Sequence, residues 1–67
     1  MNIEVVFHIF THDRDLWTEN LAMALLYYKR WKKLYRCARL YIEVYEDREN
    51  DVLLYENCLL WVGDFPQ

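Results

Sequence analysis

The stretch Ala38 to Glu46, ARLYIEVYE, decides the fold of this chain. Its residues alternate between an apolar face and an outer face, which is the period-two pattern of a half-exposed strand. The apolar face consists of Ala38, Leu40, Ile42 and Val44, and the outer face consists of Arg39, Tyr41, Glu43 and Tyr45. We therefore expect a sheet that buries one face against another element.

The residues after this strand predict a hairpin. Asp47 to Asp51, DREND, is a polar turn whose length suits a hairpin loop. Val52 to Val62 is apolar again, except for Glu56 and Asn57. This pattern predicts either one strand with a bulge or two short strands with a tight turn. Gly63 to Gln67 is expected to be a tail.

The residues before the strand predict a helix and a further strand. An amphipathic stripe at three-and-four spacing indicates a helix that runs to about residue 35; it contains Trp17, Leu21, Ala24, Leu25, Tyr28, Trp31 and Tyr35. The break before it offers Thr11, Asp13 and Asp15 as helix N-caps. Ile3 to Phe10, IEVVFHIF, predicts a strand that is apolar on both faces and is therefore central.

Together these elements predict an α+β fold in a single domain over residues 1–67. The expected order is strand, helix, strand, strand, with one long amphipathic helix packed on a mainly antiparallel sheet of three to four strands. If the first two strands were neighbours, a right-handed crossover through the helix would make them parallel.

Composition narrows the class of protein. A chain of 67 residues that is 55% hydrophobic is too apolar for a disordered protein, but it buries only ~60% of its unfolded surface. Two cysteines are too few for the disulfide framework of a small secreted domain. The start does not resemble a signal peptide, and Asn20 to Tyr28, the longest uncharged apolar stretch in the middle, falls short of the ~20 residues of a membrane span. We expect a soluble protein in the cytoplasm of a bacterial host, without membrane contact.

Charge is segregated along the chain. Six basic residues and no acidic residue lie between positions 21 and 39, whereas seven acidic residues lie between positions 40 and 67. The basic residues complement the dipole at the end of the helix, or they form a docking surface for phosphates or an acidic protein patch. The candidate partner-binding residues on this basic helix face are Lys29, Arg30, Lys33 and Arg36.

The hairpin gives a second candidate surface, which is acidic and aromatic. Its acidic residues keep the protein soluble and its edge unreactive, or they fit the basic groove of a partner. The candidate partner-binding residues of this hairpin are Tyr41, Glu43, Tyr45, Glu46, Asp47, Glu49 and Asp51. Tyr55 and Trp61 are expected to join the two tyrosines on the face away from the helix, and such a patch of rings favours an interface.

Residue types suited to catalysis are sparse. His8 and His12 lie on a strand and in the following loop, where a spacing of four does not bring two metal ligands to one face. Cys37 has arginines nearby but no histidine placed to activate it. The chain contains no serine, and Gly63 is its only glycine, so a glycine-rich phosphate loop is excluded. We expect no enzymatic activity, no cofactor and no metal.

The layout resembles small proteins encoded by phages and other mobile elements, including anti-CRISPR and other anti-defence inhibitors. The resemblance rests on the short chain, the element order, the acidic balance, RLYIEVYED at residues 39–47 and NCLLWVGDFP at residues 57–66. It implies action by binding and steric block rather than by catalysis.

Three functions follow as hypotheses. The first is a non-enzymatic inhibitor that binds and occludes a host protein or nucleoprotein complex. The second is a small nucleic-acid-binding module that uses the basic helix end and the aromatic rings of the sheet. The third is a homodimeric structural or regulatory domain whose sheet face is its own interface.

Overall fold

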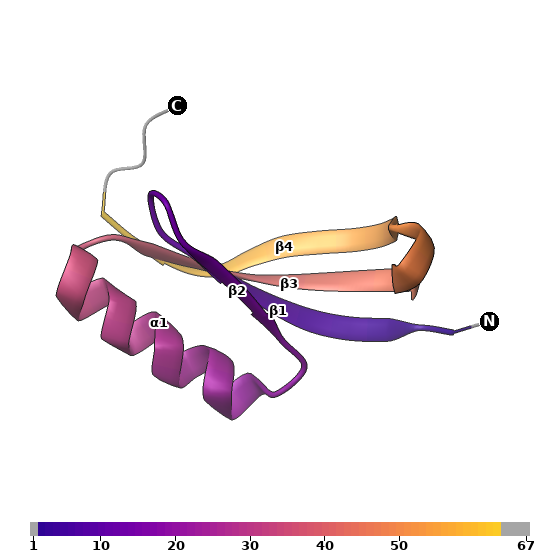
Figure 1. Ribbon diagram of the computed structural model, residues 1–67, viewed down its shortest axis with the longest axis horizontal. Helices are drawn as coiled ribbons and strands as arrows, with labels where there is room; N and C mark the ends of the chain where they lie inside the picture. The colour runs from indigo at the N-terminus through magenta and orange to yellow at the C-terminus, as the bar shows by residue number, and fades with distance from the viewer. Residues whose placement is uncertain (1, 64–67) are drawn as a thin grey trace.

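A computed structural model describes residues 2–63 of the chain. The elements in chain order are β1 (Glu4–Phe10), β2 (Asp15–Thr18), α1 (Leu21–Tyr35), β3 (Ala38–Asp47), a 3-10 turn η1 (Arg48–Asn50) and β4 (Val52–Val62). The four strands form one antiparallel sheet in the order β2-β1-β3-β4 (Figure 1). The predicted α+β fold, with one helix on a mainly antiparallel sheet, is confirmed.

The strand β2 was not predicted. Its residues were assigned to the start of the helix, but they pair with β1, with Trp17 opposite His8 and Leu16 opposite Ile9. The backbone N–H of Thr11 donates to the carbonyl of Arg14 across 3.0 Å and closes the turn between the two strands. Four residues are too few to distinguish a strand from a helical turn by periodicity, so the pairing with β1 decides the conformation.

The helix consequently begins later than predicted, at Leu21. Its N-cap is Asn20, whose side-chain oxygen accepts a hydrogen bond from the backbone N–H of Met23 across 3.1 Å. Thr11, Asp13 and Asp15 therefore do not cap the helix, and its first turn contains no acidic residue. Its last turn contains Lys32 and Lys33, so the charges complement the dipole only at the C-terminal end.

The extra strand also corrects the expected crossover. The hairpin β1–β2 reverses the chain before the helix begins, so β3 returns beside β1 in the antiparallel sense. A parallel pair would have required the helix to follow β1 directly. The prediction that β1 is central is confirmed, because it lies between β2 and β3.

The core lies between α1 and one face of the sheet. Ala24 and Tyr28 of the helix pack against Ile9 of β1 and against Ala38 and Leu40 of β3. These residues face the helix because they are alternate positions of their strands, as the period-two pattern predicted. Each of the three sheet residues is at most 1% exposed.

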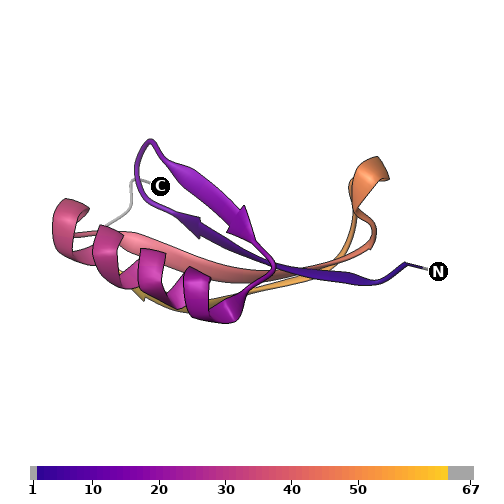
Figure 2. The same cartoon turned by 60° about the horizontal axis from the view of Figure 1, so that its bottom comes forward.

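The helix covers only part of the sheet. Figures 1 and 2 show α1 beneath one end, whereas the start of β1 and the turn η1 extend beyond it at the other end. A single helix of 15 residues is about 22 Å long at 1.5 Å per residue. It cannot cover four strands, the longest of which has 11 residues.

The C-terminal segment forms one irregular strand, so the bulged-strand alternative is correct. The register between β3 and β4 shifts three times, between Leu40 and Tyr41 and then on either side of Tyr45. Gly63 ends the strand with a φ of 88°, where a Cβ atom would lie 2.5 Å from the carbonyl oxygen of Arg36. The rest of the expected tail lies outside the described residues.

Candidate interaction surface

The face of the sheet opposite α1 carries a polar cluster around Glu43. This side chain was predicted to lie on an exposed outer face, but Glu43 is only 6% exposed. Its Oε2 lies 3.1 Å from Nδ1 of His8, while its Oε1 accepts hydrogen bonds from Nε1 of Trp17 at 3.2 Å and from the hydroxyl of Tyr45 at 2.7 Å. A buried carboxylate is stable when it has several donors, and these three residues supply them.

The hydrogen bond to Glu43 changes the acidity of Tyr45. It raises the pKa of the Tyr45 phenol to about 12, with further contributions from burial and from the negative charges of Glu43 and Asp51. The phenol therefore stays protonated, and able to donate a hydrogen bond, well above neutral pH. This part of the predicted acidic and aromatic hairpin is a structural network.

The imidazole of His8 lies between two carboxylates. Its Nδ1 contacts Glu43, and its Nε2 lies 3.4 Å from Oδ2 of Asp15. The ring stacks on Trp17 with centroids 4.0 Å apart and an interplanar angle of 9°. Within the described residues Nε2 is buried and has no hydrogen-bond partner, although the carboxylate of Asp15 lies within ion-pair distance of it. His8 therefore links β1 to both neighbouring strands, through Asp15 and Trp17 of β2 and through Glu43 of β3.

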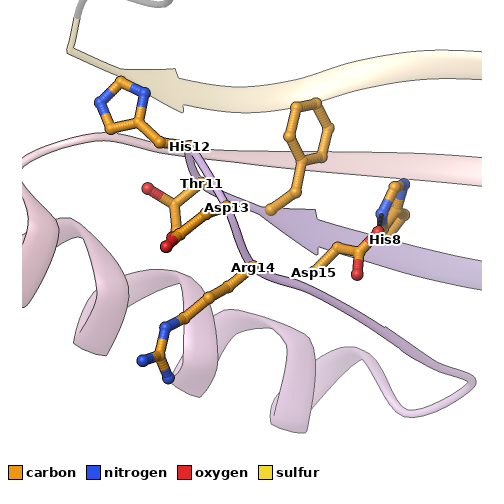
Figure 3. Close-up of a pocket in the computed structure, with 7 residues that line it drawn as sticks. His8, Thr11, His12, Asp13, Arg14 and Asp15 are labelled. Carbon is orange, nitrogen blue, oxygen red and sulfur yellow. Dashed lines mark ion pairs between the residues drawn. The ribbon is translucent and has the colours of Figure 1, made fainter.

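A surface depression lies beside this cluster, along the turn between β1 and β2. It is lined by His8, Phe10, Thr11, His12, Asp13, Arg14 and Asp15. Figure 3 shows Asp15 directed toward His8, whereas Arg14 extends toward α1. The guanidinium of Arg14 lies 5.4 Å from the ring centre of Tyr35, which ties this turn to the last turn of the helix.

Cys37 is a buried structural residue. Its thiol lies 3.0 Å from the hydroxyl of Thr11, and the residue is 3% exposed. This contact links the end of β1 to the start of β3. The Cys37 thiol is therefore almost fully withdrawn from solvent.

The four residues predicted on the basic helix face are all exposed. Lys29, Arg30 and Lys33 project from α1, and Arg36 follows it in the left-handed conformation with a φ of 62°. Within residues 2–63, none of them forms an ion pair with a carboxylate. Arg30 instead lies 5.9 Å from the ring centre of Tyr27. Three of these charges therefore lie on α1, and the fourth follows directly after its last residue.

The residues predicted on the hairpin divide into two groups. Tyr41, Glu43 and Tyr45 lie on the helix-free face, where Glu43 is withdrawn from solvent. Glu46, Asp47 and Glu49 line a depression at the η1 end, together with Asn2 and Glu4. Asp51 takes the left-handed conformation that closes the turn, with a φ of 62°. The hairpin is therefore acidic at its tip and fixed by hydrogen bonds further along.

The predicted four-ring patch on the helix-free face does not form. Trp61 lies opposite Arg39 and shares that face with Tyr41 and Tyr45. Tyr55 pairs with Val44, whose neighbours on β1 and β3 place it on the helix side of the sheet. The prediction for Tyr55 is wrong because the bulges of β4 shift its alternation by one residue, which moves a side chain to the other face.

A long run of exposed apolar side chains lies on β4, of which the sequence analysis named only Tyr55 and Trp61 as surface residues. None of its 11 residues is fully buried. Its apolar residues that are between 41% and 65% exposed are Val52, Leu53, Leu54, Tyr55, Leu59, Leu60 and Trp61. The strand is also the edge of the sheet, so its outer backbone groups have no strand partner within the described residues. The apolar run was visible in the sequence, but its edge position was not.

In residues 2–63 no helix has the length and apolarity needed to cross a membrane, and no group of three or more His, Cys, Asp or Glu side chains is placed to hold a metal ion. Comparisons with known proteins add no relative: no protein-family model, no curated protein and no solved structure gives a significant match to this chain.

Proposed function

We propose that this protein is a non-enzymatic interaction protein that binds another protein by strand addition at β4. In this mode an extended segment of the partner pairs with an exposed sheet edge through backbone hydrogen bonds, and alternate side chains fill pockets on either face. The observation that carries the proposal is the 11-residue edge strand with exposed apolar side chains along its length. Strands of globular proteins usually have about five or six residues.

The edge lacks much of the protection that natural sheets use against unwanted pairing. Such sheets protect their edges with lysines, prolines, bulges or short strands. The pairing of β4 with β3 has three irregularities of register, but β4 contains no lysine or proline and carries Glu56 as its single charged residue. A strand that is long, apolar and weakly protected is suited to bind a partner.

The resemblance to inhibitors from mobile elements suggests the class of partner. In that role the partner is a host protein or nucleoprotein complex, which the chain blocks sterically. The cluster around Glu43 supports a binding function rather than catalysis, because both oxygens of this carboxylate are engaged by hydrogen bonds with His8, Trp17 and Tyr45.

Affinity capture from a bacterial lysate tests the proposal. The tagged protein is used before and after nuclease treatment, and bound proteins are identified by mass spectrometry. The variant Tyr55→Lys/Leu59→Lys adds two charges to the edge and should lose the bound protein. The matched variant Lys29→Glu/Lys33→Glu changes charge on α1 and should retain it. Retention of the same partner by the edge variant would contradict strand addition at β4.

Nucleic-acid binding is a second candidate, and it is favoured by one observation. Lys29, Arg30, Lys33 and Arg36 are exposed, and within the described residues none is neutralised by a carboxylate. Phosphate contacts make binding fall steeply with salt, at a slope near −0.9 for each neutralised phosphate of duplex DNA. Binding to a labelled oligonucleotide that weakens steeply with salt, and is lost in Lys29→Glu/Lys33→Glu, would support this function. No binding at low salt would remove it.

A further inference from the structure

We propose that the segment that binds β4 is the β4 strand of a second copy, so that two chains form one continuous eight-stranded antiparallel sheet. The inference rests on strand addition at the edge named in the proposed function, but it makes a second copy of the chain, in place of a host protein, the occupant of β4. The two strands would pair about a twofold axis at Asn57. The argument comes from the sequence of β4, from the faces of its side chains and from its charge.

The pattern of apolar and polar residues along β4 is almost the same in both chain directions. Its sequence, VLLYENCLLWV, has a polar centre, Glu56 to Cys58, between two apolar arms of four residues each. In a twofold antiparallel pair centred on Asn57, Leu53 lies opposite Trp61, Leu54 opposite Leu60, and Tyr55 opposite Leu59. Every apolar residue therefore meets an apolar residue. Such cross-strand pairs of aromatic and aliphatic side chains stabilise antiparallel sheets.

The faces of the side chains agree with this register. Residues directly opposite each other in an antiparallel pair must lie on the same face of the sheet. Leu53 pairs with Tyr45 and Trp61 with Arg39, which places both on the helix-free face. Glu56 and Cys58 also share that face, since their partners are Glu43 and Tyr41.

The charge of Glu56 and the faces of the side chains favour the register centred on Asn57 over registers shifted by one residue in either direction. A pair centred on Glu56 would place two carboxylates directly opposite each other, which destabilises a sheet. A pair centred on Cys58 would place Tyr55, on the helix side, opposite Trp61, on the helix-free side. Centring on Asn57 places Glu56 opposite Cys58 and avoids both conflicts. The strand is thus complementary to itself in one register.

The symmetry has a consequence for the assembled surface. A twofold axis that relates neighbouring antiparallel strands runs perpendicular to the sheet and leaves each face on its own side. Both α1 helices therefore lie on one face of the dimer, with their basic residues directed to the same side. In the dimer β4 is no longer an edge, and β2 becomes the edge strand at both ends.

Cysteine cross-linking tests the register directly. In a Cys58→Ser background the variant Asn57→Cys places two thiols at the axis, where opposite Cα atoms are about 4.5–5.5 Å apart and within the range of a disulfide. The matched variant Leu53→Cys places its two thiols on the order of 27 Å apart, since eight residues at 3.4 Å separate them along the pair. The remaining thiol, Cys37, is buried in both.

The expected result is rapid oxidation of Asn57→Cys to a covalent dimer, while Leu53→Cys remains largely uncross-linked. Light scattering of the wild-type chain at micromolar concentration should give twice the 8.4 kDa chain mass. Tyr55→Lys/Leu59→Lys sets lysine against lysine at two places and should give a monomer. Tyr55→Lys/Leu59→Glu sets lysine against glutamate at the same two places and should restore the dimer.

The outcomes separate this inference from the proposed function. A monomeric wild-type chain, or equal cross-linking of Asn57→Cys and Leu53→Cys, would overturn the self-pairing. If that monomer still captured another protein, and lost it in Tyr55→Lys/Leu59→Lys, strand addition at β4 would stand with a different occupant. If the edge variants changed neither the mass nor the captured proteins, both proposals would be wrong.

Discussion

The neighbouring strands β3 and β4 are both rich in apolar residues, yet the chain buries one and exposes the other. β3 lies between two strands and under the helix, and Ala38 and Leu40 are at most 1% exposed. Their partners on β4, Val62 and Leu60, lie opposite them at the edge, and Leu60 is 41% exposed. Burial in this molecule therefore depends on position in the sheet more than on residue type. A strand that remains apolar at the edge is a surface suited to a partner.

We expect the largest difference in unfolding free energy when one leucine is truncated on β3 and the leucine opposite it is truncated on β4. Leu40→Ala removes a fully buried side chain, and we expect the free energy of unfolding to fall by about 2–5 kcal/mol. Leu60→Ala on the opposite strand should cost less than about 1 kcal/mol. Both variants are compared by urea denaturation in the Tyr55→Lys/Leu59→Lys background, so that self-association does not contribute. Equal losses would mean that β4 is as well covered as β3.

Two glutamates that face each other across the strands give the next comparison. Glu43→Gln replaces a carboxylate oxygen with an amide N–H₂ among three donors, and we expect a loss of about 1–3 kcal/mol. Glu56→Gln on exposed β4 removes a like charge opposite Glu43 and should leave stability unchanged or slightly higher. Chemical denaturation of both variants measures the difference. A neutral Glu43→Gln would contradict a structural role for the network.

The N-cap of α1 should contribute less to the free energy of unfolding than the buried leucine or the buried glutamate. Asn20→Ala removes the acceptor for the N–H of Met23 and should lower the free energy of unfolding by about 1 kcal/mol. Asp13→Ala alters a residue that the sequence pattern favoured as a cap but that lies in the β1–β2 turn, and it should have little effect. Thermal denaturation followed by circular dichroism compares the two. A larger loss in Asp13→Ala would restore the earlier helix start.

The smallest effect at neutral pH concerns the ionisation of Tyr45, because the phenol loses its proton only in alkaline solution. The folded-state pKa of about 12 lies above the ordinary value of 10.0. The contribution of this group to stability is therefore complete below pH 10 and is lost as the pH rises toward 12, because the unfolded chain loses the proton first. Stability measured across this range should fall less steeply in Tyr45→Phe. Identical profiles for the two proteins would contradict the hydrogen bond to Glu43.

Periodicity predicted those parts of the fold that are long and repetitive. β1, β3 and the later turns of α1 appear where the spacing of apolar residues placed them. The prediction failed for β2, because Trp17 fits the helical stripe of Leu21 and Tyr28 as well as it fits a short strand. It failed again for Tyr55, because bulges break the alternation on which a face is predicted. Both failures come from contacts between residues far apart in the chain.

The sequence predicted the solvent exposure of some residues on the candidate surfaces but not of others. The exposure of Lys29 and Lys33 followed from their place on the polar side of the stripe. The burial of Glu43 did not, because a glutamate at an alternating position is usually exposed, and only the convergence of His8, Trp17 and Tyr45 from three strands makes its burial tolerable. The protein-binding role and the phage-type inhibitor function remain proposals.

The sequence by itself determined that this chain is an α+β protein with an amphipathic helix, an acidic hairpin and an apolar C-terminal segment, because periodicity, charge and order are local properties. Only the tertiary structure decided which strand lies at the edge, which glutamate is buried and how far the helix reaches. These properties depend on pairing between distant segments, where backbone hydrogen bonds and burial outweigh the local preferences of a few residues.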